Sequence, residues 1–187
     1  TRRSSDLANM IDLSAGGGSF SASAAGTQTA NNTYSASVTF GTHANTAALY
    51  NTVKVGIGNG TVGGSTGAWT FTPTAAANTT LTGAAAGDVL VFKQATAADI
   101  TFVAQTAAQQ TLITADTTIA AAISHAFGNL AATANQASSF TWNGDTYVIF
   151  NSNADSSLSV GDAIVKLVGV HGVADFGTAN GSIALTS

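Results

Sequence analysis

Apolar and polar residues alternate along much of this chain, in short runs separated by turn-forming residues. The alternation is clearest at residues 34–40 and 53–57, where every second side chain is apolar. A period of two indicates a strand with one buried and one polar face. Short apolar runs that stop at turn residues predict further strands. These lie at residues 69–71, 79–82, 89–92, 100–103, 140–142, 147–150, 163–170 and 183–185.

Residues 140–150 carry the strongest hairpin signal in the chain. The pair Asn143-Gly144 separates two apolar runs. Asn-Gly is favoured in two-residue hairpin turns, because both positions there need a positive φ. We therefore predict two antiparallel strands that meet at this turn.

The pattern changes to helical spacing at residues 116–130. Asp116 is a suitable N-cap, and Gly128-Asn129 predicts the end of the helix. The apolar positions three or four residues apart are Ile119, Ile123, Phe127 and Leu130. Such a stripe must lie against another apolar surface, here a sheet.

Together these elements predict a mainly β fold. We expect an antiparallel β-sandwich with one α-helix, about residues 116–130, covering it. Residues 1–32 are low in complexity and predict a flexible arm or linker. Residues 33–187 form the sandwich domain, and a subdivision near residues 105–115 stays open.

The low content of charged residues limits the kinds of partner and assembly that we expect for this chain. Charged residues make up 7% of the 187 positions, against about a quarter in an average protein. The polar surface must consist of small Thr, Ser, Asn and Gly residues, which suits a subunit packed in a lattice or filament. The five basic residues form no cluster and the net charge is −4, so we expect no nucleic-acid partner. No stretch is apolar enough to predict a membrane span.

The catalytic motifs fail in their context. Gly58, Gly60 and Gly63 match the spacing of a dinucleotide-binding loop, but an aromatic strand follows instead of the helix that this site needs. The run Gly63-Gly64-Ser65-Thr66-Gly67 matches G-x-S-x-G, but the same aromatic strand follows it instead of the helix that a nucleophile elbow needs. The chain has no Cys and no HExxH sequence. His43, His125 and His171 lie far apart in the sequence. We therefore expect no enzyme activity, no catalytic residue and no cofactor other than a metal ion.

The polar loop at residues 151–162 is the best candidate site. Oxygen-bearing side chains recur at alternate positions, which suits a calcium ion. The candidate ligands are Asn151, Asn153, Asp155 and Asp162. The alternative is that these side chains cap their own backbone. Capping is favoured, since two carboxylates are few for tight calcium binding.

Five aromatic residues offer a second kind of site. A stacking surface for a glycan is one interpretation of these side chains, and core or cross-strand packing is the more usual one. They are Tyr34, Tyr50, Trp69, Trp142 and Tyr147.

Two segments carry a resemblance to a known class of proteins. Residues 81–92 contain T-G-A-A-A-G-D between two strands, and residues 116–170 combine an Ala-rich helix, F-T-W-N-G-D-T-Y-V-I-F, a polar loop and G-D-A-I-V-K-L-V-G-V. The chain thus resembles the C-terminal regions of type-I-secreted S-layer and RTX-type surface proteins of bacteria. That resemblance implies export and assembly outside the cell. The calcium-binding G-G-x-G-x-D repeat of RTX proteins is absent from the sequence.

These observations lead to two hypotheses on function. The first is a non-catalytic extracellular structural module that assembles with copies of itself into a surface layer or filament, by adding a strand from residues 1–32 to a neighbour's sheet. The alternative is a secreted monomeric adhesin or glycan-binding domain. Its partner would be a glycan or cell-surface polysaccharide. A secreted hydrolase is a third class, testable by substrate screening.

Overall fold

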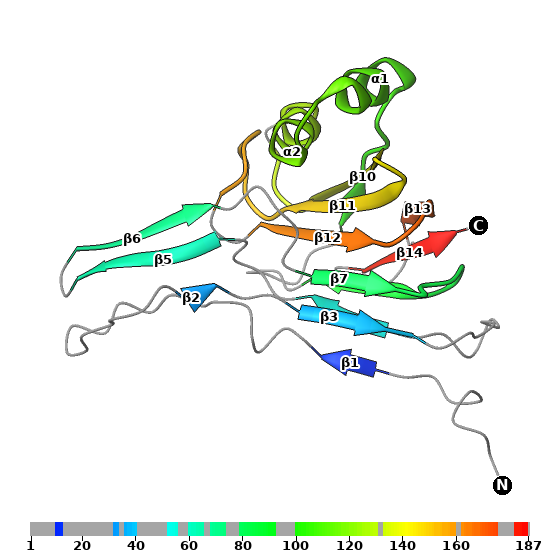
Figure 1. Ribbon diagram of the computed structural model, residues 1–187, viewed down its shortest axis with the longest axis horizontal. Coiled ribbons are helices and arrows are strands. Elements are labelled where there is room, and N and C mark those ends of the chain that lie inside the picture. Colours follow the sequence, from blue (N-terminus) through cyan, green and yellow to red (C-terminus); the bar gives the residue numbers. More distant parts are fainter. Residues whose placement is uncertain are drawn as a thin grey trace, which may run out of the picture.

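The computed structural model describes most of the C-terminal half and shorter parts of the N-terminal half. The described residues are 10–12, 32–33, 36–40, 52–55, 60–65, 68–73, 79–92, 100–130, 133–159, 162–175 and 182–186. Within them the chain forms three sheets and two helices (Figure 1).

A six-stranded sheet lies in the middle of the molecule. Its strands, in spatial order, are β3 (Ala36–Thr39), β7 (Thr79–Thr82), β12 (Ala163–Leu167), β11 (Asp145–Asn151), β10 (Gln136–Trp142) and β9 (Thr101–Phe102). The β10–β11 hairpin turns at Asn143 and Gly144, which have φ values of 49° and 82°. Both values are positive, so the hairpin predicted from Asn-Gly is confirmed.

A five-stranded sheet packs against one face of the six-stranded sheet. In spatial order it contains β1 (Met10–Asp12), β4 (Thr52–Val55), β8 (Val89–Phe92), β14 (Ser182–Thr186) and β13 (Gly172–Asp175). The short strand β1 is an edge strand of this sheet, and it pairs with β4 in parallel.

A third, three-stranded sheet projects from the two larger ones. It consists of β2 (Asn32–Thr33), β5 (Gly60–Ser65) and β6 (Ala68–Pro73), and in Figure 1 the β5–β6 hairpin extends to the left. Gly63 lies inside β5, which pairs with β6 in antiparallel fashion. A strand, not a helix, therefore follows the Gly58-x-Gly60 sequence, and the aromatic strand predicted at residues 69–71 is β6.

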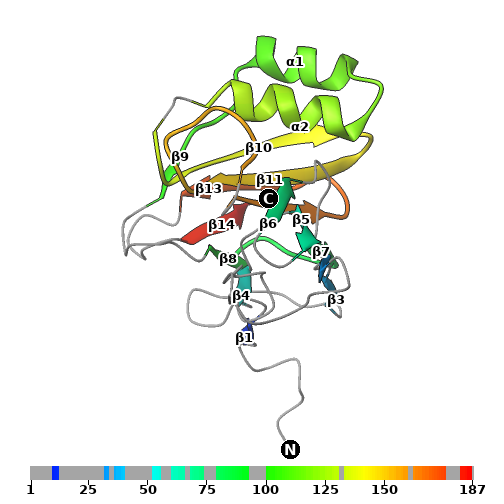
Figure 2. The same cartoon turned by 90° about the vertical axis from the view of Figure 1, so that its left-hand side faces the viewer.

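Two helices cover the other face of the six-stranded sheet at β10 and β11 (Figure 2). They are α1 (Ala107–Ala115) and α2 (Ile119–Gly128). The predicted helix at 116–130 is therefore confirmed as an element, but its predicted start is wrong. Thr118 is the N-cap of α2 because its side chain accepts a hydrogen bond from the Ala121 N–H, and Asp116 instead ends α1.

Helix α1 is missing from the sequence-based prediction. Only Ile113 of its nine residues is buried, so it has no apolar stripe to reveal it. Its sequence signal is a capping box, in which Thr106 and Gln109 bond to each other's backbone N–H groups. Neither described helix is long and apolar enough to span a membrane.

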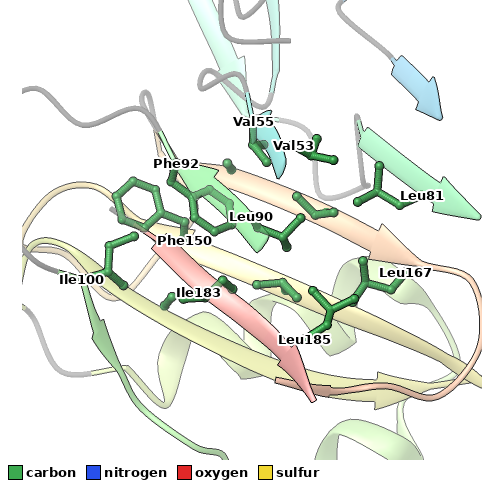
Figure 3. Packing of buried hydrophobic residues seen from close by; sticks show 14 residues of the cluster. Val53, Val55, Leu81, Leu90, Phe92, Ile100, Phe150, Leu167, Ile183 and Leu185 are labelled. Carbon is green, nitrogen blue, oxygen red and sulfur yellow. The ribbon is translucent and has the colours of Figure 1, made fainter. Parts of the chain in front are cut away.

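The main hydrophobic core lies between the two larger sheets (Figure 3). Phe92 of β8 and Phe150 of β11 stack there, with ring centroids 5.0 Å apart. The other buried members include Val53, Val55, Leu81, Leu90, Ile100, Val148, Val165, Leu167, Ile183 and Leu185. Burial of this many large side chains supplies the main stabilisation of the sandwich.

A second core lies between the six-stranded sheet and the helices. It contains Ile113, Ala122, Ile123, Ala126, Phe127, Leu130, Phe140, Tyr147, Ile149 and Ile164. Strand β11 therefore alternates between two cores, and residues 146–151 are buried on both faces. A central strand with two covered faces explains why the run at residues 147–150 is continuously apolar.

The predicted mainly β sandwich with a covering helix is thus confirmed. Direction within the sheets is mixed: the pairs β1–β4, β4–β8, β3–β7, β7–β12 and β9–β10 are parallel, and the remaining pairs are antiparallel. Side-chain periodicity is the same in both kinds of strand, so it could not predict this. Parallel neighbours need long connections, and here strands from the N-terminal half lie beside strands far along the chain.

Candidate functional site

The polar loop between β11 and β12 is organised around one buried carboxylate. Asp162 is fully buried. Its Oδ1 accepts hydrogen bonds from the N–H and hydroxyl of Ser152, at 2.9 and 3.1 Å. Its Oδ2 accepts from the N–H and hydroxyl of Ser159, at 2.7 and 3.0 Å. Asp162 therefore clamps both ends of the loop to the start of β12.

Burial raises the pKa of the Asp162 carboxyl above its usual value, because desolvation disfavours the charged form. The four donors from Ser152 and Ser159 act in the opposite direction, since they stabilise the carboxylate. Two of them are backbone N–H groups, which cannot turn away. The loop thus needs an acceptor with two oxygens at this position.

The other three candidate ligands lie in the same loop and also bind its backbone. Asn151 Oδ1 accepts from the Asn153 N–H at 3.2 Å, and Asn151 Nδ2 donates to the carbonyl of Asp155. Asn153 Nδ2 donates to the Ser159 hydroxyl at 2.6 Å. The Asp155 carboxylate accepts from the Ser157 N–H at 3.2 Å.

The structure therefore brings all four candidate residues into one loop, and each of them holds that loop together. Both oxygens of Asp162 are engaged by protein donors. This geometry is what the capping interpretation predicts, and calcium binding stays a prediction. Ser152 and Ser159 were not predicted as site residues, because their only signal in the sequence is their spacing around Asp162.

A second polar cluster lies at the other end of β11 and β12. Lys166 Nζ forms an ion pair with Asp145 Oδ2 at 2.7 Å, and Asp145 Oδ1 accepts from the Gly169 N–H at 2.9 Å. The hydrogen bond to Lys166 is the main cause of a lowered pKa of Asp145. The same bond raises the pKa of Lys166.

These two shifts decide what the cluster can do chemically. A Lys side chain attacks a carbonyl only as the neutral amine. A raised pKa keeps Lys166 protonated, so its ammonium group is a poor nucleophile and a good partner for a carboxylate. The pair is suited to joining β11, β12 and the turn at Gly169, which is a structural task.

The ion pair predicts a pH-dependent loss of stability in the variant Asp145→Asn. Asn still accepts from the Gly169 N–H, so only the ion pair is removed. The side chains are 21% and 31% exposed, so we expect a loss of about 1 kcal/mol. Because the folded pKa of Asp145 lies below 3.8, its contribution is present above that pH and disappears as the pH falls further.

Lys166 sets the upper end of this pH range, because its folded pKa is raised above 10.5. The ion pair is therefore lost on the alkaline side only as the pH rises through that raised pKa. Urea unfolding at pH 3, 5, 7 and 9 measures the difference between the parent chain and Asp145→Asn. The difference should be constant from pH 5 to 9 and smaller at pH 3. Lys166→Met in both backgrounds supplies the double-mutant cycle. An equal difference at pH 3 and pH 7 would contradict the ion-pair origin.

The two described histidines, His125 and His171, take separate structural roles. His125 Nδ1 lies 2.8 Å from Asp116 Oδ2, which links α2 to the end of α1. His171 Nε2 lies 3.0 Å from the Val168 carbonyl oxygen, and His43 lies outside the described residues. In the part of the chain that the structure describes, no three Asp or His side chains gather as a metal-binding group.

Two of the candidate aromatic residues pack on each other. The rings of Trp142 and Tyr147 meet edge to face at 6.4 Å, and Tyr147 stacks on Phe140 at 5.3 Å. Trp142 Nε1 also donates to the Asp116 carbonyl. Tyr147 is buried, so this cluster belongs to the packing beneath the helices. The side chains of Tyr34, Tyr50 and Trp69 lie outside the described residues.

No protein-family model matches this chain, and no curated protein matches it.

Proposed function

We propose that this chain is a non-catalytic structural module that acts outside the cell and assembles with copies of itself by exchanging the edge strand β1. The observation that carries the proposal is the pairing of β1 with β4. Met10, Ile11 and Asp12 pair in parallel with Thr52, Val53 and Lys54. This is the shortest contribution to the five-stranded sheet, and it comes from the part of the chain predicted to be an arm.

The geometry of an edge strand explains why exchange is feasible. Strand β1 pairs with β4 alone among the described strands, so no second neighbour holds it in place. A neighbouring copy can present the same residues to β4 and form the same backbone hydrogen bonds. Exchange of an identical element costs little, because each bond lost in one chain is regained in another.

The surface and the ionisable groups support a structural role. Charged residues make up 7% of the chain, so contacts between copies desolvate few charges. Val168 and Val170, near the β12–β13 turn, are 40% and 72% exposed. Asp116, Asp145 and Asp162 each hold two segments of the fold together. The location outside the cell rests on the resemblance of residues 116–170 to secreted bacterial surface proteins.

Electron microscopy and analytical ultracentrifugation of the purified chain test this proposal. The parent chain should form ordered polymers as its concentration rises. Deletion of residues 1–32 removes β1, and we expect this variant to stay folded by circular dichroism and to remain monomeric. Deletion of residues 1–9 is the matched control, because it leaves β1 in place and should assemble. Equal polymers from all three proteins would overturn strand exchange, and monomers throughout would favour the adhesin alternative.

A further inference from the structure

Two buried side-chain oxygens near the β11–β12 loop have no hydrogen-bond donor among the residues that the structure describes. They are Gln136 Oε1 and Asn153 Oδ1. Gln136 is only 7% exposed, so bulk water does not compensate for the missing partner. A buried carbonyl oxygen without a partner destabilises a fold, so each of these atoms needs an ordered water or a bound cation beside it.

Gln136 and Asn153 each lie beside Asn151, the first through the strand register and the second through a hydrogen bond. Gln136 is the direct partner of Asn151 in the β10–β11 ladder, and paired residues project their side chains from the same face of a sheet. The carboxamide of Asn151 holds the loop through the Asn153 N–H and the Asp155 carbonyl. Gln136 and Asn153 are thus linked through Asn151.

The same loop also supplies a negative charge, on Asp155. Within the described residues, the Asp155 carboxylate accepts one hydrogen bond, from Ser157, so it retains lone pairs for another partner. Asp162 differs, because protein donors already engage both of its oxygens. The available groups are therefore two neutral carbonyl oxygens and one carboxylate, all of which are hard oxygen ligands.

We propose that Gln136 Oε1, Asn153 Oδ1 and the Asp155 carboxylate bind a divalent cation of the calcium type, with Asp162 outside the coordination shell. The ion satisfies both orphaned oxygens and ties the start of β10 to the loop after β11. Calcium accepts six to eight oxygens in flexible geometry, so water completes the shell. One carboxylate gives weak binding, with a Kd on the order of 10⁻³ M, as in extracellular modules. This inference does not depend on self-assembly.

Calorimetric titration and thermal unfolding of the full chain after EDTA treatment test the site. Calcium chloride at 10 mM should raise the Tm by about 3–6 °C, because that concentration is about ten times the expected Kd. Sodium chloride at equal ionic strength controls for charge screening. Magnesium chloride should give a smaller shift, since magnesium demands a stricter octahedral shell.

Three variants locate the ion. Gln136→Leu removes an orphaned oxygen, so without calcium it should be at least as stable as the parent chain, and with calcium it should gain nothing. Asp155→Asn should weaken binding at least tenfold. Asp116→Asn makes the same change in net charge elsewhere and should respond as the parent does. Absence of a calcium response in the parent, or equal responses in all variants, would overturn the proposal and leave water as the partner of these oxygens.

Discussion

Cysteines introduced at Asp12 and Lys54 are expected to form disulfides between chains in assembled protein and within one chain in dilute monomer. The two residues are register partners in the β1–β4 pair. Neighbouring strands lie about 4.8 Å apart, which is within the Cα–Cα range of about 4.4–6.8 Å that a disulfide bridges. The sequence contains no other Cys, so every disulfide reports this one contact.

Non-reducing gel electrophoresis after brief oxidation measures the outcome. Polymers should yield a ladder of covalent multimers, and monomer at low concentration should yield a single band. Gly172→Cys with Thr186→Cys is the matched control, because these β13–β14 partners lie within the C-terminal part of one chain and should cross-link internally in both states. Polymers that give only internal disulfides at positions 12 and 54 would exclude strand exchange, while self-assembly by another surface would stand.

Replacement of Asp162 by Ala is expected to cost about 3 kcal/mol of unfolding free energy. The change leaves two backbone N–H groups, of Ser152 and Ser159, without their acceptor. Each buried donor that loses its partner costs about 1–3 kcal/mol. Removing the carboxylate also removes the cost of burying it. The expected loss is therefore smaller than the two donor penalties added together. Asp162→Asn retains one acceptor oxygen and should lose about half as much.

Urea denaturation at pH 7 without calcium measures the effect of each variant. Asp155→Ala is the matched control in the same loop, because it removes a single hydrogen bond from a half-buried carboxylate, that to Ser157. We expect it to cost about 1 kcal/mol or less. A loss at Asp162 no larger than the loss at Asp155 would show that the carboxylate does not hold the loop.

Local sequence signals predicted the elements whose neighbours are close in the chain. Asn143-Gly144 predicted the β10–β11 hairpin, because a two-residue turn fixes both the direction and the register of its strands. The stripe from Ile119 to Leu130 predicted α2, because helical spacing reports a single buried face. The Asp-rich and Asn-rich loop was found for the same reason, since its partners lie within about a dozen residues.

Contacts between segments that lie far apart in the sequence gave no such local signal. The parallel pairing of β4 with β8, or of β7 with β12, depends on long connections that no periodicity records. Gln136 shows the same limit at the candidate site. It lies 15 positions before its partner Asn151, and a lone Gln at the start of a strand carries no signal of burial. Only the register revealed that it lies beside Asn151, where the loop begins.

The interleaving of the strands has a consequence for how a newly made chain folds. Strand β14 lies between β8 and β13, and β12 lies between β7 and β11. Without β14 and β12, the strands of each larger sheet remain in two separate groups. These groups are joined only after the last quarter of the chain has been synthesised. Among the described elements, the helices and the β5–β6 and β10–β11 hairpins can form earlier from local contacts, and non-local strand pairing is slow. A ribosome-bound or partly translocated chain that lacks residues 163–186 should therefore remain open, without either sandwich sheet.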